Sequence, residues 1–293
     1  MELSLRGRGI FLQNLRRLNL ELFKKALKSG TSKDALELCL FAHEILSEKN
    51  TTVLKTLKRL DFLFHEFSAY VSEYEDSLEG ISALNSFLFN TKGFKCSPGA
   101  IHDNDKIFIS KVIECRHGHP LSLSLIYREL ARRIHKSPIE LVNFPGHFFI
   151  KFNYQHQLRF LDPSDCGRLL SVSDLQKKLT SRFGKAVVLS GTFLETPSET
   201  QIVVKFLNKL KAVYFERRQW DFLLVTLDML VALEPERVVE YKERGLLLYQ
   251  LGYLNEAYPD LDFFVSKSRP SPEIDKLKSL MTHLRHPDIS PLF

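Results

Sequence analysis

The residues of this sequence best suited to chemistry are one histidine and one aspartate in a short stretch rich in strand-forming residues. If residues 147–152 and 157–161 pair as a hairpin around a four-residue loop, the register sets His147 directly opposite Asp162. Opposed residues have Cβ atoms about 4.5–5.5 Å apart, a distance at which a carboxylate can orient an imidazole. The spacing therefore predicts a histidine–aspartate pair.

Such a pair supplies two members of a nucleophilic triad, and the third is typically a nucleophile at a helix N-terminus. A helix is expected to begin at Pro120, because the missing N–H of proline is tolerated there. Its first turn has no cysteine. Ser122 lies about 200° around the helix from Pro120, so we expect its hydroxyl to bond to local backbone or its side chain to pack in the helix. Cys115 or Cys166 could contact the histidine only if its loop folds inward, and a buried thiol is the commoner outcome.

Metal binding is not predicted here. His117 and His119 lie close together, but no third ligand stands at a recognisable spacing. The histidine–aspartate pair itself has two other readings, as a buried structural pair or as a retained ligand-binding site. Arg116 is interpreted as anchoring a loop or helix end through its guanidinium group. No cofactor is predicted.

The surrounding elements follow from hydrophobic periodicity and turn residues. Helices are expected over much of residues 10–70, with a start at Thr31 and Ser32, and a loop over 93–104. Further along, we expect a helix at 120–134, strands at 139–144, 147–152, 157–161 and 186–194, and a helix at 174–183 capped by Ser171 or Ser173.

The last third of the chain contains an internal repeat. An offset of 34 residues aligns Trp220 with Leu254 and Leu227 with Leu261. Gly245 is one of the small residues that tetratricopeptide repeats need for close helix packing. Two such units cannot bury their own faces, so a helix at 273–285 is expected to cover one end and the preceding domain the other.

Composition excludes several classes of protein. The chain of 293 residues is 44% hydrophobic and 26% charged, as in folded globular proteins, and lacks an apolar run long enough to span a membrane. Its four cysteines are scattered, which favours a reducing compartment and predicts a cytoplasmic protein. The net charge of +6 is concentrated in the first 28 residues, but no nucleic-acid-binding motif accompanies it, so nucleic acid is not an expected partner.

Three motifs in order, followed by the repeats, resemble the SirB-type proteins, a bacterial branch of the transglutaminase-like superfamily. The first motif contains Arg116, Gly118, Pro120 and Ser122; the second is Pro145-Gly146-His147-Phe148; the third is Asp162-Pro163. The resemblance runs from about residue 35 to 284. It implies an α+β fold: a helical N-terminal region at 1–92, a papain-like transglutaminase core at 93–195, and tetratricopeptide-like repeats at 200–286.

The resemblance also implies that catalysis is lost. Active relatives carry a cysteine two residues after a glycine at the start of the core helix, then a histidine and an aspartate. Here the glycine corresponds to Gly118, so Pro120 occupies the cysteine position, while His147 and Asp162 match the other two members. The turn after Asp-Pro, usually rich in glycine, reads Ser164-Asp165-Cys166-Gly167.

Two hypotheses about function follow. The first is a catalytically inactive, regulatory scaffold that binds a protein or peptide through the repeat groove and the degenerate cleft. The alternative is a cysteine-dependent hydrolase or acyl transferase that uses Cys115 or Cys166 with His147 and Asp162.

Overall fold

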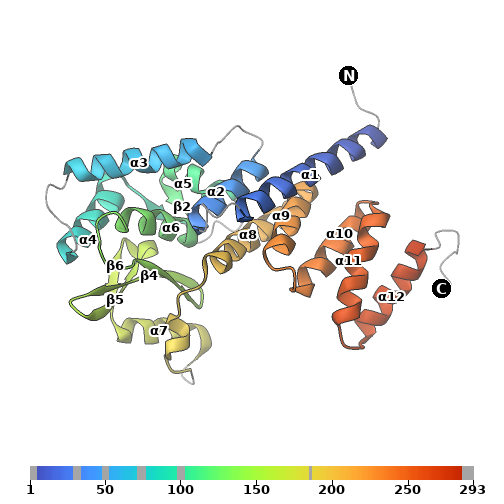
Figure 1. Cartoon of the computed structure of the whole chain (residues 1–293). Helices are drawn as coiled ribbons and strands as arrows, with labels where there is room; N and C mark the ends of the chain where they lie inside the picture. Colours follow the sequence, from blue (N-terminus) through green and yellow to red (C-terminus); the bar gives the residue numbers. More distant parts are fainter. Residues whose placement is uncertain are drawn as a thin grey trace. The chain divides into compact units, whose positions relative to one another are not determined.

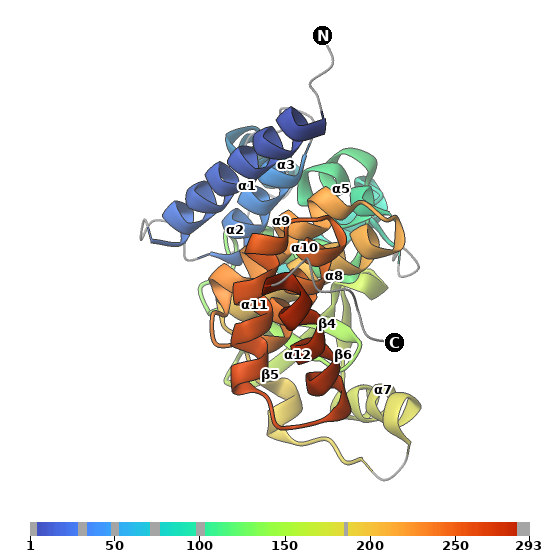
Figure 2. The same cartoon turned by 90° about the vertical axis from the view of Figure 1, so that its right-hand side faces the viewer.

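The computed structural model describes residues 5–28, 34–47, 53–70, 77–97, 103–184 and 187–285. Its internal contacts divide the chain into two compact units (Figures 1 and 2). The larger unit is residues 29–209, and the smaller unit joins residues 1–28 to residues 210–293. The predicted boundaries near residues 92 and 195 stay predictions.

The larger unit begins with helices. They are α2 (Ala35–Leu46), α3 (Val53–Tyr70), α4 (Leu78–Asn85) with a π-helical turn at Ser86–Thr91, α5 (Ile109–Cys115) and α6 (Pro120–Ala131). Asp34 caps α2 by accepting a hydrogen bond from the Leu36 N–H, while the expected start at Thr31 and Ser32 lies outside the described residues. The expected loop at 93–104 contains a short strand, β1 (Lys95–Cys96), which pairs in parallel with β2 (His117–Gly118).

A four-stranded antiparallel sheet follows in the order β3 (Glu140–Phe144), β4 (His147–Tyr154), β5 (Gln157–Asp162) and β6 (Arg168–Leu170). Helix α7 (Val172–Phe183) comes next, and Ser171 caps it in a reciprocal arrangement with Asp174. By strand alternation, Val142, Phe149 and Phe160 share one sheet face, and they form an apolar cluster with Leu175 and Leu179 of α7. Helix α6 packs on the other face, where the Ser124 hydroxyl donates to the Phe148 carbonyl.

The predicted register of the β4–β5 hairpin is wrong. Tyr154 pairs with Gln157, so the loop is the two-residue turn Gln155-His156 rather than four residues. Both turn residues have positive φ, 48° and 60°, as in the type I′ turn that matches strand twist. The pairing is displaced by two residues and brings Asp162 level with Phe149 instead of His147. An even displacement leaves both site residues on the same face of the sheet.

The prediction of a strand at 186–194 is also wrong for residues 187–194, which the structure describes. Residues 187–190 are irregular and Gly191–Leu194 forms a 3₁₀ turn. The side-chain amide of Gln176 donates to the Val187 carbonyl, and its oxygen accepts from the Leu189 N–H. These bonds take the place of strand pairing. The apolar side chains of this segment pack on the cluster that contains Leu175 and Leu179; they are Val187, Leu189, Phe193 and Leu194.

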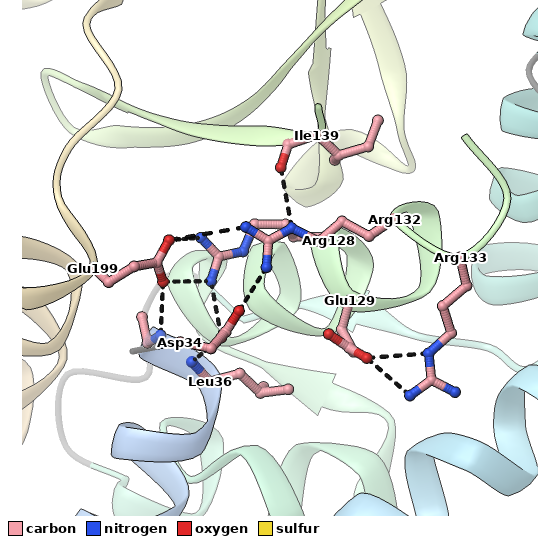
Figure 3. Close-up of polar contacts among 9 residues, drawn as sticks. Asp34, Leu36, Arg128, Glu129, Arg132, Arg133, Ile139 and Glu199 are labelled. Atoms are coloured by element: carbon pink, nitrogen blue, oxygen red, sulfur yellow. Dashed lines mark hydrogen bonds and ion pairs between the residues drawn. The ribbon is translucent and has the colours of Figure 1, made fainter. Parts of the chain in front are cut away.

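One buried arginine connects three helices of the larger unit (Figure 3). Arg128 of α6 is 2% exposed and donates to both carboxylate oxygens of Glu199, at 2.8 and 2.9 Å. Glu199 begins α8 (Glu199–Glu216) and also accepts a hydrogen bond from the Ala35 N–H at 2.6 Å. Asp34 completes the cluster by accepting from Arg128 and Arg132. A guanidinium that is buried this deeply requires such paired acceptors.

The smaller unit contains the repeats. Its helices are α1 (Leu5–Lys28), the end of α8, α9 (Trp220–Leu233), α10 (Val238–Gln250), α11 (Leu254–Lys267) and α12 (Pro272–Arg285). A Cβ atom on Gly245 would lie 2.9 Å from two side-chain atoms of Leu261, which explains the small residue predicted there. Helix α12 packs on Leu261 and Phe264, as expected for the covering helix, and α1 packs against α9. None of the described helices combines the length and apolar content that crossing a membrane requires.

Candidate functional site

Asp162 ends β5 and is buried. Its Oδ1 accepts hydrogen bonds from the backbone N–H of Ser164, at 3.0 Å, and from the Ser164 hydroxyl. Its Oδ2 lies 3.2 Å from Lys178 Nζ, an ion pair without the alignment of a hydrogen bond. The carboxylate is therefore held by a local turn and by a lysine of α7.

His147 begins β4 and is half-buried. Its ring stacks on Phe149 at 5.4 Å between centroids, with 18° between the planes. Burial lowers the pKa of His147, Lys178 and Arg182 lower it further, and Asp162 acts in the opposite direction. Among the hydrogen bonds of the described residues, none involves this ring. His147 and Asp162 are thus electrostatic neighbours at one end of the sheet, and the imidazole is held by stacking.

Lys178 and Arg182 are site residues that sequence reasoning missed. They lie four residues apart on α7, and so on one face of that helix. Arg182 lies against the β3–β4 turn, where a Cβ atom on Gly146 would be 2.8 Å from its Nη1. The spacing of the two cations within the predicted helix 174–183 was available in the sequence, but no local pattern indicated that this face would cover His147.

The start of α6 agrees with the prediction for Pro120, which is the first helical residue. His119 is the N-cap, and its Nδ1 accepts the Leu121 N–H at 3.2 Å. Burial, with a smaller effect from Lys209, lowers the pKa of His119 to about 4, so the ring is neutral at pH 7. Close packing explains why position 118 is a glycine, because a Cβ atom on Gly118 would lie 2.5 Å from Val112 Cγ1.

The thiols around this region are Cys96, Cys115 and Cys166. Cys96 was missed by sequence reasoning; it is paired with Gly118 across β1–β2. Burial raises the pKa of Cys96 to about 11, and Asp162 and Cys166 add to the effect. Cys115 and Cys166 are both exposed, so the expectation of buried thiols is wrong. The Cys115 Sγ lies 3.2 Å from the His117 carbonyl, and Cys166 follows the turn after Pro163. No contact described for these residues joins the Sγ of Cys115 or Cys166 to the His147 ring.

The remaining predicted residues have structural contacts. The buried Ser122 hydroxyl donates to the Ile107 carbonyl, 15 residues earlier in the chain, so its acceptor is not the local backbone that was expected. Arg116 ends α5 with a positive φ and lies over the Phe94 ring, 4.8 Å from its centroid. Pro145 and Gly146 form the β3–β4 turn, and Pro163 begins a 3₁₀ turn. Within the described part of the chain, no group of three metal-binding side chains comes together.

Comparison with known proteins gives two family matches. Residues 54–208 match the model described as the transglutaminase-like superfamily, and residues 210–282 match a tetratricopeptide repeat model. Both matches confirm the predicted fold class. No solved structure matches the chain.

Alignments with curated relatives cover most of the chain. A UPF0162 protein of Xylella fastidiosa (strain 9a5c) is 28% identical over 227 residues, which is 74% of this chain and 80% of the relative. Protein SirB1 of Salmonella typhimurium is 25% identical, and UPF0162 protein YchA of Escherichia coli K12 is 26% identical. Each of these two alignments covers 81% of this chain and 87% of the relative. The predicted resemblance to SirB-type proteins is confirmed.

Proposed function

Because the chain belongs to the transglutaminase-like superfamily, we propose that it is a catalytically inactive member that acts as a regulatory scaffold and binds a protein or peptide. The observation that carries the proposal is Pro120 as the first residue of α6. The resemblance assigns this position to the catalytic cysteine, and a proline ring cannot act as a nucleophile. The proposal keeps the predicted three-part domain division and a cytoplasmic location, which the four free cysteines favour.

The electrostatics of the site support the loss of catalysis. In a working triad the carboxylate orients the imidazole and stabilises its protonated form. Here Asp162 is bonded to Ser164 and paired with Lys178, and the pKa of His147 is lowered. The pKa of the Cys96 thiol is about 11, so its thiolate is scarce at neutral pH. Among the described residues, the imidazole therefore has neither a hydrogen-bonded carboxylate nor a thiolate beside it, which supports the proposed loss of catalysis.

The repeats supply the binding surface in this proposal. Helices α8, α9 and α10 enclose a hollow of about 430 Å³ within the smaller unit. Trp220, Leu223 and Leu227 line it, and Phe215 at its edge is 63% exposed. Lys211 and Glu243 form an ion pair of 2.6 Å there. An apolar hollow with aromatic walls and few charges suits one or two apolar side chains of a peptide.

Cysteine labelling separates the scaffold from the alternative hydrolase. The full-length protein is treated with iodoacetamide between pH 5 and 9, and the labelled residues are mapped by mass spectrometry. We expect Cys115 and Cys166 to react slowly and at similar rates. A single cysteine that reacts far faster at acidic pH, and slows in His147→Ala, would instead establish the enzyme.

The binding role is tested by photocrosslinking in cells. A benzophenone amino acid replaces Phe215, and a matched variant carries it at Val188, an exposed position of the larger unit. We expect a discrete protein adduct only from position 215, and we expect Leu246→Glu, which places a charge in the same hollow, to abolish it. Equal adducts from both positions would reject the repeat hollow as the binding site.

A further inference from the structure

A second hollow, of about 720 Å³, lies between α3 and α5 in the larger unit. Its apolar lining includes Leu54, Phe62, Leu63 and Ile113. Leu54 is 71% exposed and Phe62 is 66% exposed, although both belong to a regular, well-packed helix. Eight residues separate them, so they are about 12 Å apart along one side of α3. Two large apolar side chains left in water beside a concave surface indicate a docking site.

The charges at this hollow favour a negatively charged partner. The lining contains two acids, and both are already neutralised: Glu66 by Lys92, and Glu114 by Arg59 and Lys111. In contrast, Lys58 makes no hydrogen bond or ion pair within the described part of the chain. Arg116 also lines the hollow and is only half-buried; its guanidinium lies over the Phe94 ring but forms no ion pair within the described part of the chain. Cationic groups therefore remain available, while the acidic groups do not.

We propose that this α3–α5 hollow binds an acidic amphipathic helix of a partner protein. The apolar side chains of that helix, spaced two turns apart, contact Leu54 and Phe62, while its Asp or Glu side chains pair with Lys58 and Arg116. An anionic membrane or a nucleic acid fits less well, because the surface is a concave hollow with a largely apolar lining. This site goes beyond the proposed function, which uses a different unit of the molecule.

The test uses the full-length protein and a designed fluorescent peptide of about four helical turns. The peptide carries leucines on one face and glutamates beside them, and its matched control replaces every glutamate with lysine. Fluorescence anisotropy at low salt is expected to show binding of the acidic peptide alone. Phe62→Glu is expected to weaken it at least about tenfold, as for an interface hot spot. Lys58→Glu is expected to weaken the acidic peptide and to improve the lysine peptide.

Phe215→Glu is the matched control, because it changes an equally exposed phenylalanine in the repeat hollow. Circular dichroism melting checks that each variant folds. Loss of binding in Phe215→Glu but not in Phe62→Glu would overturn the proposal and move the peptide to the repeats. Absence of acidic-peptide binding would overturn it as well. So would Phe62-dependent binding to phosphatidylserine vesicles without binding of the peptide. None of these outcomes depends on whether the chain is catalytically inactive.

Discussion

Lys178 determines the charge balance around the histidine–aspartate pair. Its ammonium group neutralises Asp162 at 3.2 Å and also lowers the pKa of His147. A neutral imidazole stacked on Phe149 is compatible with an apolar cluster, whereas an imidazolium would require its own acceptor. A lysine thus performs the electrostatic role that a protonated histidine has in an active triad.

Replacing Lys178 with methionine is expected to change the titration of His147. The variant removes a cation that lowers the pKa of this imidazole and releases the Asp162 carboxylate, which raises it, so the pKa of His147 should increase. It should also cost about 1–3 kcal/mol of unfolding free energy, because Asp162 is left buried with only its Ser164 bonds. NMR titration and urea denaturation measure the two effects. Lys177→Met, an exposed neighbour, is the control; an unchanged His147 pKa in Lys178→Met would refute this account.

At the scale of elements, the repeats depend on close approach between α10 and α11. Gly245 is buried against Leu261 and Asp260, and Ala257 on α11 is fully buried. Small residues at these positions let the two helices pack together, and larger ones force them apart. The 34-residue period itself is visible in large apolar residues that the helices bury, such as Leu227 and Leu261.

Gly245→Val is expected to destabilise the smaller unit by about 1–3 kcal/mol through overpacking. Thermal melting followed by circular dichroism measures the loss. Gly191→Val is the matched control, since no atom lies near an added Cβ atom there. Because the two side chains touch, Gly245→Val combined with Leu261→Ala should cost less than the sum of the two single changes. Equal stability of Gly245→Val and the wild-type protein would show that the helices can separate at no cost.

At the scale of the molecule, the smaller unit contains both ends of the described chain. Arg16 of α1 donates to Asp228 of α9 and to Glu256 of α11. Arg244 of α10 donates to the same Asp228 and to Asp260. Asp228 is almost fully buried, so its charge requires these two guanidinium groups. The first helix of the chain is therefore an integral part of the repeat unit.

Arg16→Gln is expected to loosen the repeats selectively. Loss of the guanidinium should lower the free energy of unfolding by about 1.5–3 kcal/mol, the range for hydrogen bonds to charged groups. Hydrogen exchange should increase in α9 and α11 and stay unchanged in α6 and β4, because the contacts of the chain divide into two units. Arg17→Gln, which changes an exposed neighbour, should have no effect. Uniform acceleration across the whole chain would contradict the division.

The sequence by itself determined the features that depend on nearby residues or on a repeating pattern. Pro120 marks the start of α6, strands form at three of the four stretches where β-forming residues are dense, and the 34-residue period identifies the repeats. The motifs around His147 and Asp162 were also sufficient to indicate the superfamily. These signals are local because they arise from backbone preference and from side-chain periodicity.

Only the tertiary structure decided the contacts between distant residues. The Gln155-His156 turn carries no glycine or asparagine, so the hairpin register had no local signal. Glu199 is 71 residues from Arg128, and Lys178 lies on a helix separate from the strands that carry the motif residues. Which cation neutralises a buried carboxylate depends on how helices and strands pack together, and one sequence does not encode that choice in any short pattern.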